Sequence, residues 1–407
     1  MKHKIVTVIN YFNLYSALLL TASSIYYYNI QRWPFVLFFA SYLFEFILEK
    51  KWENIPFTKA RTFYVVMAFF FLLAFVYYPF DTPKYFHWLL DRRFALFGFA
   101  AVGFFGVNNK FKLSYFLNTF IISSIISIAY LVFIRIGILE FFKDPQRFVV
   151  FNLKRIEFVN MHRIFNLYLN VALIGIWYIL TRSWKRTIWL KRLLYLGSLM
   201  IIFSALSVSE GRTGLVASLI LIISFFFYET LKRKKIIGYL ISFFVLILMI
   251  FVGVNQKRMS EKMVETEPRW FLWESAFSVI KDKPVFGHGI SNAQEEFDVA
   301  RTKFQTEEYR LTWIKSKLLD SHNQFLQTTM EFGVFGFLIL LFLYLYPIAI
   351  ADNKRKLFSM FLIFLCINQS MFDTFITGTF ASIFGFMMLM TLSIENDIDI
   401  DTTKKIT

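Results

Sequence analysis

The segment DSHNQFLQTTMEFGVFG, residues 320–336, joins the longest polar stretch of the chain to an apolar run that continues to Pro347. Ser321 is followed three residues later by Gln324, a capping-box pattern that predicts a helix start here. His322 would then lie in the first turn of a membrane helix, at the water boundary, where the helix dipole disfavours the imidazolium form. A neutral imidazole in that position can accept a proton.

Two glycines follow on the same predicted helix. Gly333 lies eleven residues after His322, about three helical turns, so the two residues fall on nearly the same face, and Gly336 lies close to that face. Small residues there predict that a second helix packs closely beneath the histidine.

The composition is that of a polytopic membrane protein. The 407-residue chain is 57% hydrophobic and contains 54 phenylalanines, and its apolar residues come in runs rather than in amphipathic stripes. The net charge of +16 comes from basic residues in short loops between those runs, which does not fit a nucleic-acid-binding domain. The single cysteine, Cys366, lies in an apolar run, which excludes a disulfide framework and a Cys-based metal site. We interpret the N-terminal apolar run as a retained signal anchor.

Hydropathy predicts an all-α polytopic membrane protein with about twelve transmembrane helices. The predicted spans are residues 12–29, 33–48, 62–80, 93–107, 113–139, 164–180, 191–208, 213–230, 235–254, 324–347, 357–373 and 375–393. Residues 1–407 form a single integral membrane domain with no internal repeat. One large outer loop, residues 255–323, lies between the ninth and tenth spans.

The basic residues of the short loops predict the orientation. With a cytoplasmic N-terminus, the inner connections contain Lys50, Lys51, Lys59, Arg61, Lys110, Lys112, Arg182, Lys185, Arg186, Lys191, Arg192, Lys232, Arg233, Lys234, Lys235, Lys354, Arg355 and Lys356. The short outer connections are poorer in charge, with Arg32, then Lys84, Arg92 and Arg93, then Arg212. Both termini are therefore predicted to be cytoplasmic, and His322 faces the outside.

The loop 255–323 is predicted to contain surface helices. Glu267-Pro268-Arg269 has the pattern of a helix start. Trp270, Trp273, Phe277 and Ile280 then recur at helical spacing, which predicts an amphipathic helix lying on the membrane surface. A second surface helix is expected within residues 291–317.

Four groups at the outer boundary are candidates for chemistry. Arg212 comes at the start of the eighth span, where free backbone N–H groups and a guanidinium form a candidate anion site. Arg269 begins the predicted surface helix, and Asp373 ends the eleventh span on the same side as His322. Each group also has a simpler explanation. Arg212 could anchor a helix at the membrane interface, and Arg269 could be a solvated charge. His322 could be a helix-end histidine with no role, and Asp373 could form an ion pair for stability.

Together these groups suit a lipid-linked pyrophosphate donor. Guanidinium groups can hold two phosphates and stabilise the charge that grows as pyrophosphate leaves, while a histidine takes the proton of an attacking sugar hydroxyl. The chain has no GxSxG, P-loop or Asp-x-Asp pattern and no His/Asp/Glu spacing typical of a metal site. No metal and no cofactor are therefore predicted.

Three motifs carry a family resemblance. His322-Asn323 with Gly333 and Gly336 resembles the His-Asn/Ser-x9-Gly-x-x-Gly motif of the O-antigen ligase and O-antigen polymerase superfamily. Residues 269–273 with 284–289 resemble its Arg-x3-Trp…Pro-x-x-Gly-x-Gly segment. Residues 209–212 resemble its Ser-x-Ser-Arg segment, with Gly211 where serine is usual. The resemblance covers residues 195–393, and the first half of the chain matches only as a hydropathy pattern.

The resemblance implies a metal-independent, inverting glycosyltransferase of the bacterial inner membrane. Such an enzyme takes a glycan from undecaprenyl pyrophosphate at the periplasmic face. By matching motif, Arg212 and Arg269 would bind the pyrophosphate and His322 would activate the acceptor hydroxyl. Asp373, Asn323, Gly333 and Gly336 would support the site.

Two acceptors remain open within the family. A ligase passes the glycan to lipid A–core, whereas a polymerase passes it to a lipid-linked repeat unit. We favour the ligase because a single dominant outer loop holds the motifs.

Two functions outside the family also remain. A flippase or transporter of lipid-linked oligosaccharides would place its site at the membrane midplane, in two related halves. Here the polar groups gather at the outer boundary, and Glu45 is the one convincing mid-span charge. A passive membrane scaffold would tolerate alanine at His322 and Arg212.

Overall fold

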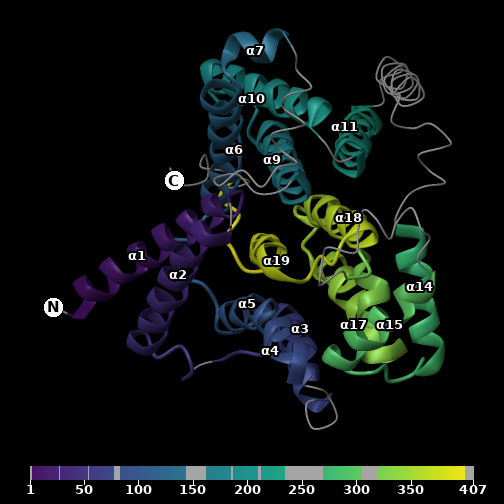
Figure 1. The fold of residues 1–407 in the computed structure, drawn as a ribbon. Coiled ribbons are helices and arrows are strands. Elements are labelled where there is room, and N and C mark those ends of the chain that lie inside the picture. The colour runs from purple at the N-terminus through teal and green to yellow at the C-terminus, as the bar shows by residue number, and fades with distance from the viewer. Residues whose placement is uncertain are drawn as a thin grey trace.

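The computed structural model describes residues 2–26, 28–53, 55–77, 83–143, 162–184, 187–209, 212–233, 269–304 and 320–398. The regular elements within these ranges are helices (Figure 1). They are α1 (Lys2–Ser23), α2 (Tyr28–Leu48), α3 (Lys59–Tyr77), α4 (Pro83–Asp91), α5 (Phe94–Phe105), α6 (Leu113–Ala129), the π-helix η2 (Tyr130–Ile136), α7 (Ile138–Lys143), α9 (His162–Ser183), α10 (Trp189–Val208), α11 (Arg212–Arg233), α14 (Arg269–Asp282), α15 (Ile290–Phe304), α17 (Gln324–Ile350), α18 (Lys356–Phe372) and α19 (Gly378–Leu392).

The helices confirm the predicted class of an all-α polytopic membrane protein. Eleven predicted spans coincide with helices, and the ninth, residues 235–254, lies outside the described residues. Six of the described segments are long and apolar enough to cross a membrane, and four shorter apolar helices accompany them. The total of twelve spans stays a prediction.

The centre of the bundle is formed by α9, α18 and α19. The most apolar window of α9 is 83% buried, and α9 packs against α6, α10, α11 and α18. Nearly every residue of α19 is buried, and α19 packs against α5 and α18. Figure 1 shows α18 and α19 between the N-terminal helices and the group formed by α14, α15 and α17. The junction of α18 and α19 is therefore held from both sides.

The helix α5 is too short to cross a membrane by itself. Its 12 residues give about 18 Å of helix, against a hydrocarbon core of about 30 Å. The turn before it, Arg92–Arg93, contacts two later helices: Gly378 N donates to the Arg92 carbonyl at 2.6 Å, and Arg93 pairs with Glu331 of α17. The short helix thus leaves two arginines packed against the C-terminal half of the bundle.

Two helices, α14 and α15, lie in the region where surface helices were predicted. They pack against each other and against α17 through a separate apolar cluster. This cluster consists of Phe271, Leu272, Ala276, Val279, Ala293, Phe297, Ala300 and Met330. The opposite side of α14 exposes Trp270 and Phe277, in keeping with the predicted amphipathic pattern. Its contact with a membrane surface stays a prediction, and residues 305–319 lie outside the described residues.

The start of α17 differs from the prediction. Asn323, not Ser321, is the N-cap: its side-chain oxygen accepts hydrogen bonds from Phe325 N at 2.9 Å and Leu326 N at 3.1 Å. Ser321 donates instead to the Asn323 carbonyl, at 2.9 Å. Asparagine is among the strongest N-caps, and here it lies directly before the helix. The predicted capping box is therefore wrong, and His322 precedes the helix rather than lying in its first turn.

Gly333 also has a different role from the predicted one. It interrupts α17 with φ 64° and ψ −160°, and a Cβ atom there would lie 2.1 Å from the Val285 carbonyl oxygen. The predicted second helix beneath the histidine is wrong, because the turn of residues 284–289 takes that position. At Gly336, the atoms nearest to an added Cβ would belong to Phe332 of the same helix.

The turn and α17 bind each other through main-chain atoms. His288 N and Gly289 N donate to the carbonyls of Met330 and Glu331 at 2.9 Å, and Val334 N donates to the Pro284 carbonyl at 2.9 Å. We call this pairing of residues 284–289 with 330–335 the glycine clasp. Two of the motifs singled out in the sequence are therefore partners in one local structure.

The helix ends alternate as the predicted topology requires. At one end, the start of α9, the start of α17 and the end of α18 meet through Arg163, His322 and Asp373. At the other end, Arg182 of α9 donates to the Lys354 carbonyl at 2.9 Å, and Leu113 N of α6 donates to the Glu395 carbonyl at 2.9 Å. Which end faces the outside stays a prediction.

Candidate functional site

His322 has an unusual backbone conformation. Its φ is 47°, in the left-handed region, and its N–H donates to Asp320 Oδ1 at 3.0 Å. Among the described residues, Lys50 is the other non-glycine residue with positive φ, and it lies in an exposed turn. Such a conformation costs on the order of 1 kcal/mol or more and persists where the surroundings fix it. Asp320 therefore positions the histidine through its backbone as well as through its ring.

The histidine ring lies against three charged side chains. Its Nδ1 is 3.2 Å from Asp320 Oδ1, 3.5 Å from Asp373 Oδ1 and 3.2 Å from Arg163 Nη1. Arg163 Nη1 is in turn 2.7 Å from Asp373 Oδ1. We call these four residues the charge cluster. Among the described residues no hydrogen-bond partner is present at Nε2, the opposite ring nitrogen.

Asp373 is ionised at neutral pH. Burial alone would raise its pKa, but the Arg163 guanidinium, the contact with His322 and the Thr374 N–H together lower the pKa to about 2. Its second oxygen, Oδ2, is buried without a hydrogen-bond partner among the described residues. The carboxylate thus provides a fixed negative charge behind the imidazole.

A set of polar contacts fixes the charge cluster in place. Asn323 Nδ2 donates to the Met371 carbonyl at 3.2 Å, and Ile376 N donates to Gln324 Oε1 at 2.8 Å. Thr374 Oγ1 donates to Asp320 Oδ2 at 2.7 Å. These contacts join the start of α17 to the segment that carries Asp373. Asn323 is therefore both the helix cap and a link between two parts of the site.

A buried ion pair also holds α17 in place. Arg93 Nη2 lies 2.6 and 2.7 Å from the two carboxylate oxygens of Glu331, and both side chains are almost fully buried. Gln327 Nε2 also donates to Glu331, at 2.9 Å. Glu331 precedes the break at Gly333, so the ion pair holds the part of α17 that follows His322.

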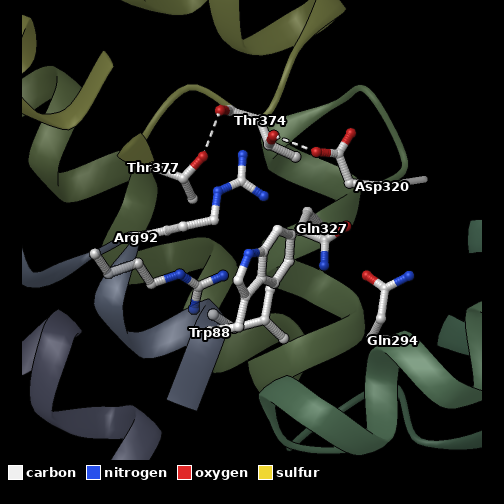
Figure 2. A pocket seen from close by; sticks show the side chains of 9 residues that line it. Trp88, Arg92, Gln294, Asp320, Gln327, Thr374 and Thr377 are labelled. Atoms are coloured by element: carbon white, nitrogen blue, oxygen red, sulfur yellow. Dashed lines mark hydrogen bonds between the residues drawn. The ribbon is translucent and has the colours of Figure 1, made fainter. Parts of the chain in front are cut away.

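A pocket opens beside the charge cluster (Figure 2). The enclosed part of this pocket is small, about 20 Å³, and most of its empty space is open to solvent. Its lining consists of Trp88, Leu89, Arg92, Arg93, Gln294, Asp320, Gln327, Thr374 and Thr377. Asp320 belongs to both the pocket wall and the charge cluster, so the two are adjacent.

The Arg92 guanidinium lies over the Trp88 ring, 4.6 Å from its centroid. Burial lowers the pKa of Arg92, and the carboxylates of Asp320 and Asp373 oppose that shift. Among the described residues no carboxylate lies within ion-pair distance of this guanidinium.

The two predicted phosphate-binding arginines lie at the starts of helices near the charge cluster. Arg269 begins α14, and its guanidinium is 5.8 Å from the centroid of the Phe372 ring, next to Asp373. Arg212 begins α11, and its side chain lies outside the described part of the structure.

The backbone around Arg212 is nevertheless placed. Ser209 Oγ donates to Asn166 Oδ1 at 2.7 Å, and Asn170 Nδ2 donates to the Gly214 carbonyl at 3.0 Å. These bonds hold the start of α11 against α9 about one to two helical turns beyond Arg163.

The structure adds residues that the motifs did not indicate. Arg163 and Asp320 complete the charge cluster, and Arg92 with Trp88 lines the pocket. Two signals were available in the sequence: Asp320 lies two residues before His322, and Arg92–Arg93 is a pair of arginines on a short outer loop.

The charge cluster also contains a possible set of metal ligands. One ligand atom from each of Asp320, His322 and Asp373 lies within 4.8 Å of the others. However, Arg163 lies among them, 2.7 Å from Asp373 and 3.2 Å from His322. Its guanidinium already neutralises the carboxylate that a cation would need, so the donor set fits a metal poorly. The absence of a metal stays a prediction.

Comparison with known proteins gives one family match. Residues 197–341 match the family described as O-antigen ligase. This region contains Arg212, Arg269, His322 and the glycine clasp. Arg92, Arg163 and Asp373 lie outside it.

Several relatives cover part of the chain. A protein of Rickettsia typhi named "Putative polysaccharide ligase" is 26% identical over 215 residues, which is 50% of this chain and 52% of that protein. A protein of Rickettsia prowazekii with the same description is 27% identical over 185 residues, 42% of this chain and 44% of that protein. An uncharacterised protein of Haemophilus influenzae is 35% identical over 80 residues. The chain therefore spans about half the length of the two Rickettsia relatives and 19% of the Haemophilus protein.

Proposed function

We propose, from the membership of residues 197–341 in the O-antigen ligase superfamily, that this multi-pass membrane protein is a glycan-transferring enzyme of the ligase type. It moves a glycan from undecaprenyl pyrophosphate to a lipid A–core acceptor, at the periplasmic face of the inner membrane. The observation that carries the proposal is the fixed orientation of His322, with Nδ1 against two carboxylates.

This orientation suits His322 to act as a general base. When Nδ1–H donates to Asp320 or Asp373, the lone pair lies on Nε2, which can take the proton of the acceptor hydroxyl. The carboxylates then stabilise the imidazolium that forms. The acceptor oxygen attacks the anomeric carbon of the glycan, and the bond from that carbon to the pyrophosphate oxygen breaks. The pyrophosphate leaves with the electron pair, so a single displacement inverts the anomeric centre.

The leaving group needs positive charge near the base. We assign this role to Arg212 and Arg269, together with the free N–H groups at the start of α11. Arg163 is already paired with Asp373, at 2.7 Å, so it orients that carboxylate. Positive charge for the donor and negative charge for the imidazolium thus come from different side chains.

The first test replaces the base. The full-length protein in lipid nanodiscs is given an undecaprenyl-pyrophosphate glycan with lipid A–core. We expect His322→Ala to lower kcat by roughly 10²–10⁴, the usual contribution of a general base. His87→Ala is the matched control, because His87 is exposed on α4 and lies outside the charge cluster. Normal transfer by His322→Ala would remove the assigned role.

The same assay tests the arginines and the acceptor. Arg212→Ala and Arg269→Ala should abolish transfer or weaken donor use strongly, while Arg135→Ala, on exposed η2, serves as the control. Product on lipid A–core identifies a ligase. Lengthening of a lipid-linked repeat unit, offered separately, identifies the polymerase that remains the alternative. Glycan lipid crossing the bilayer without transfer would favour a flippase.

The proposed mechanism requires no metal. Arg163 supplies the positive charge within the charge cluster. We expect transfer to continue at an unchanged rate after dialysis against a divalent-metal chelator. A rate that falls on chelation and returns on addition of one divalent cation would contradict this mechanism.

A further inference from the structure

The turn that carries His322 needs support from its surroundings, because a positive φ persists in a residue other than glycine only where neighbouring groups hold it. Two residues of this turn, Asp320 and Asn323, are bound by the end of α18 and the segment that follows it. Ser321 lies between them and is fully buried, and its side-chain partner is on α17 instead. The turn is therefore held from two directions.

The partner on α17 is Gln327. Ser321 N and Ser321 Oγ both donate to Gln327 Oε1, at 3.4 and 3.2 Å. Gln327 Nε2 donates to Glu331 Oε1 at 2.9 Å, and Glu331 accepts in turn from Arg93 Nη2 at 2.6 and 2.7 Å. These hydrogen bonds form a continuous series from the residue before α5 to the turn that carries His322. We call Arg93, Glu331, Gln327 and Ser321 the support chain.

The direction of each bond in the support chain follows from the chemistry of its groups. A carboxylate held by a guanidinium accepts hydrogen bonds and cannot donate them. Glu331 therefore orients the amide of Gln327, with the nitrogen towards Glu331 and the oxygen towards Ser321. A rotated amide would lose the bonds at both ends, so the side chain has a single orientation.

The far end of the support chain is anchored in the core. Arg93 directly precedes α5, which packs against α3 and α19, and its guanidinium lies 6.0 Å from the centroid of the Phe332 ring. All four side chains of the support chain are buried. Because an unpaired polar group is costly in such surroundings, a change at one end of the series affects the other end. The support chain thus ties the position of the turn to that of α5.

The groups around this turn act on a substrate through the histidine rather than by contact. Gln327 and Asp320 line the same pocket, and its enclosed space of about 20 Å³ has room for about one water molecule. Asp320 contacts Nδ1 of His322, whereas the proposed base is Nε2, on the opposite side of the ring. This side of the site therefore consists of supporting structure.

We propose that Gln327 is a positioning residue for His322. Through the support chain it holds the turn of residues 320–323 in the conformation that presents Nε2 to the acceptor hydroxyl. The effect on transfer rests on the proposed function. The holding of the turn does not.

Hydrogen–deuterium exchange measures the turn without any reaction. The full-length protein in lipid nanodiscs is compared with Gln327→Met, which keeps the length of the side chain and removes its amide. We expect residues 320–323 to exchange about tenfold faster in Gln327→Met, since Ser321 loses its partner on α17. Thr329→Ala is the matched control, because its hydroxyl bonds only within α17, to the Phe325 carbonyl at 2.7 Å. Unchanged exchange in Gln327→Met would overturn the proposal.

Kinetics test whether the position of the turn matters for transfer. We expect Gln327→Met to lower kcat by roughly 10–100-fold, with the KM values for donor and acceptor unchanged, because a displaced base is slow but does not weaken binding. Thr329→Ala should match the wild type. A raised KM with an unchanged kcat would make Gln327 a binding residue instead. If the wild type transfers no glycan, the proposed function fails, and the exchange measurement still decides whether Gln327 holds the turn.

Exchanging the two side chains separates positioning from a general loss of stability. Gln327→Glu places two carboxylates side by side, and Glu331→Gln removes the charge that pairs with Arg93. The double variant restores one carboxylate and one amide, so each bond of the support chain can form again. We expect its kcat, expressed per folded enzyme, to exceed that of both single variants. These variants give the same comparison if Gln327→Met does not fold, and a double variant no more active than Gln327→Glu would overturn the proposal.

Discussion

At the scale of single residues, the site depends on a buried carboxylate whose charge is fixed by its neighbours. Asp373 contacts Arg163 and His322, and its pKa is lowered to about 2. The histidine therefore lies beside a negative charge that does not titrate near neutral pH.

The lowered pKa predicts how acid affects stability. The ordinary value for this carboxyl is 3.8, so below that pH the unfolded chain binds a proton more readily than the folded one. The stabilisation is fully present above pH 3.8 and is lost as the pH falls towards 2. In detergent, the unfolding temperature of the wild type should fall more steeply over this interval than that of Asp373→Asn. Asp352→Asn, at a 59% exposed side chain, should keep the wild-type slope. Equal slopes in the wild type and Asp373→Asn would contradict the assignment.

The sequence indicated only part of the site, because most contacts join distant residues. His322, Arg269 and Asp373 were identified from local patterns, and the structure brings them to one end of the bundle. Arg163 is 159 residues from its partner His322, and Thr374 is 54 residues from Asp320. No local pattern carries such a contact, since only the packing of α9, α17 and α18 creates it.

At the scale of elements, the glycine clasp determines the path of α17. Gly287, Gly289 and Gly333 have φ values of 74°, 86° and 64°, a region that other residues rarely adopt. Their N–H and C=O groups, and those of their neighbours, join the turn to the helix. The helical periodicity predicted that Gly333 lies within a regular helix. Main-chain hydrogen bonds to a distant turn do not change that periodicity, so the sequence pattern could not predict them.

Substitution in the clasp should be costly. In Gly333→Ala, the left-handed backbone alone costs on the order of 1–3 kcal/mol. The new Cβ would also lie 2.1 Å from the Val285 carbonyl oxygen, so the turn must move. We expect a markedly lower unfolding temperature and loss of transfer.

The matched control for that substitution is Gly197→Ala. Gly197 lies within α10, where a Cβ would meet no atom within 4 Å. Alanine there should stabilise the helix slightly, by roughly 0.5–1 kcal/mol, because glycine loses more backbone freedom on folding. Similar unfolding temperatures for the two variants would show that the clasp contributes little.

At the scale of the whole molecule, hydropathy was sufficient to predict the helices but not the contacts between them. The apolar runs predicted every apolar helix of ten or more residues that transmembrane-like composition marks among the described residues, because a run that lies in lipid must satisfy its backbone within a helix. The contact of α14 and α15 with α17, and the packing of the Arg92–Arg93 turn, depend on side chains meeting across the bundle. The pattern of residues within one apolar run cannot predict those contacts.

Cysteine labelling tests the predicted orientation. In a Cys366→Ala background, which removes a buried thiol, Lys84→Cys and Asp352→Cys place single thiols near opposite ends of the bundle. We expect a membrane-impermeant maleimide to label Lys84→Cys in intact spheroplasts and Asp352→Cys only after permeabilisation. The reverse pattern would place His322 in the cytoplasm and remove the periplasmic site.

The assembly of the charge cluster also has an order in time. His322 is synthesised 159 residues after Arg163, and Asp373 another 51 residues later. At about 5–20 residues per second, the ribosome needs about 10–40 s to add them. During this interval neither His322 nor Asp373 is present to contact the Arg163 guanidinium. The charge cluster therefore cannot form until the segment with Asp373 has been synthesised, so any function that depends on the cluster belongs to the nearly finished chain.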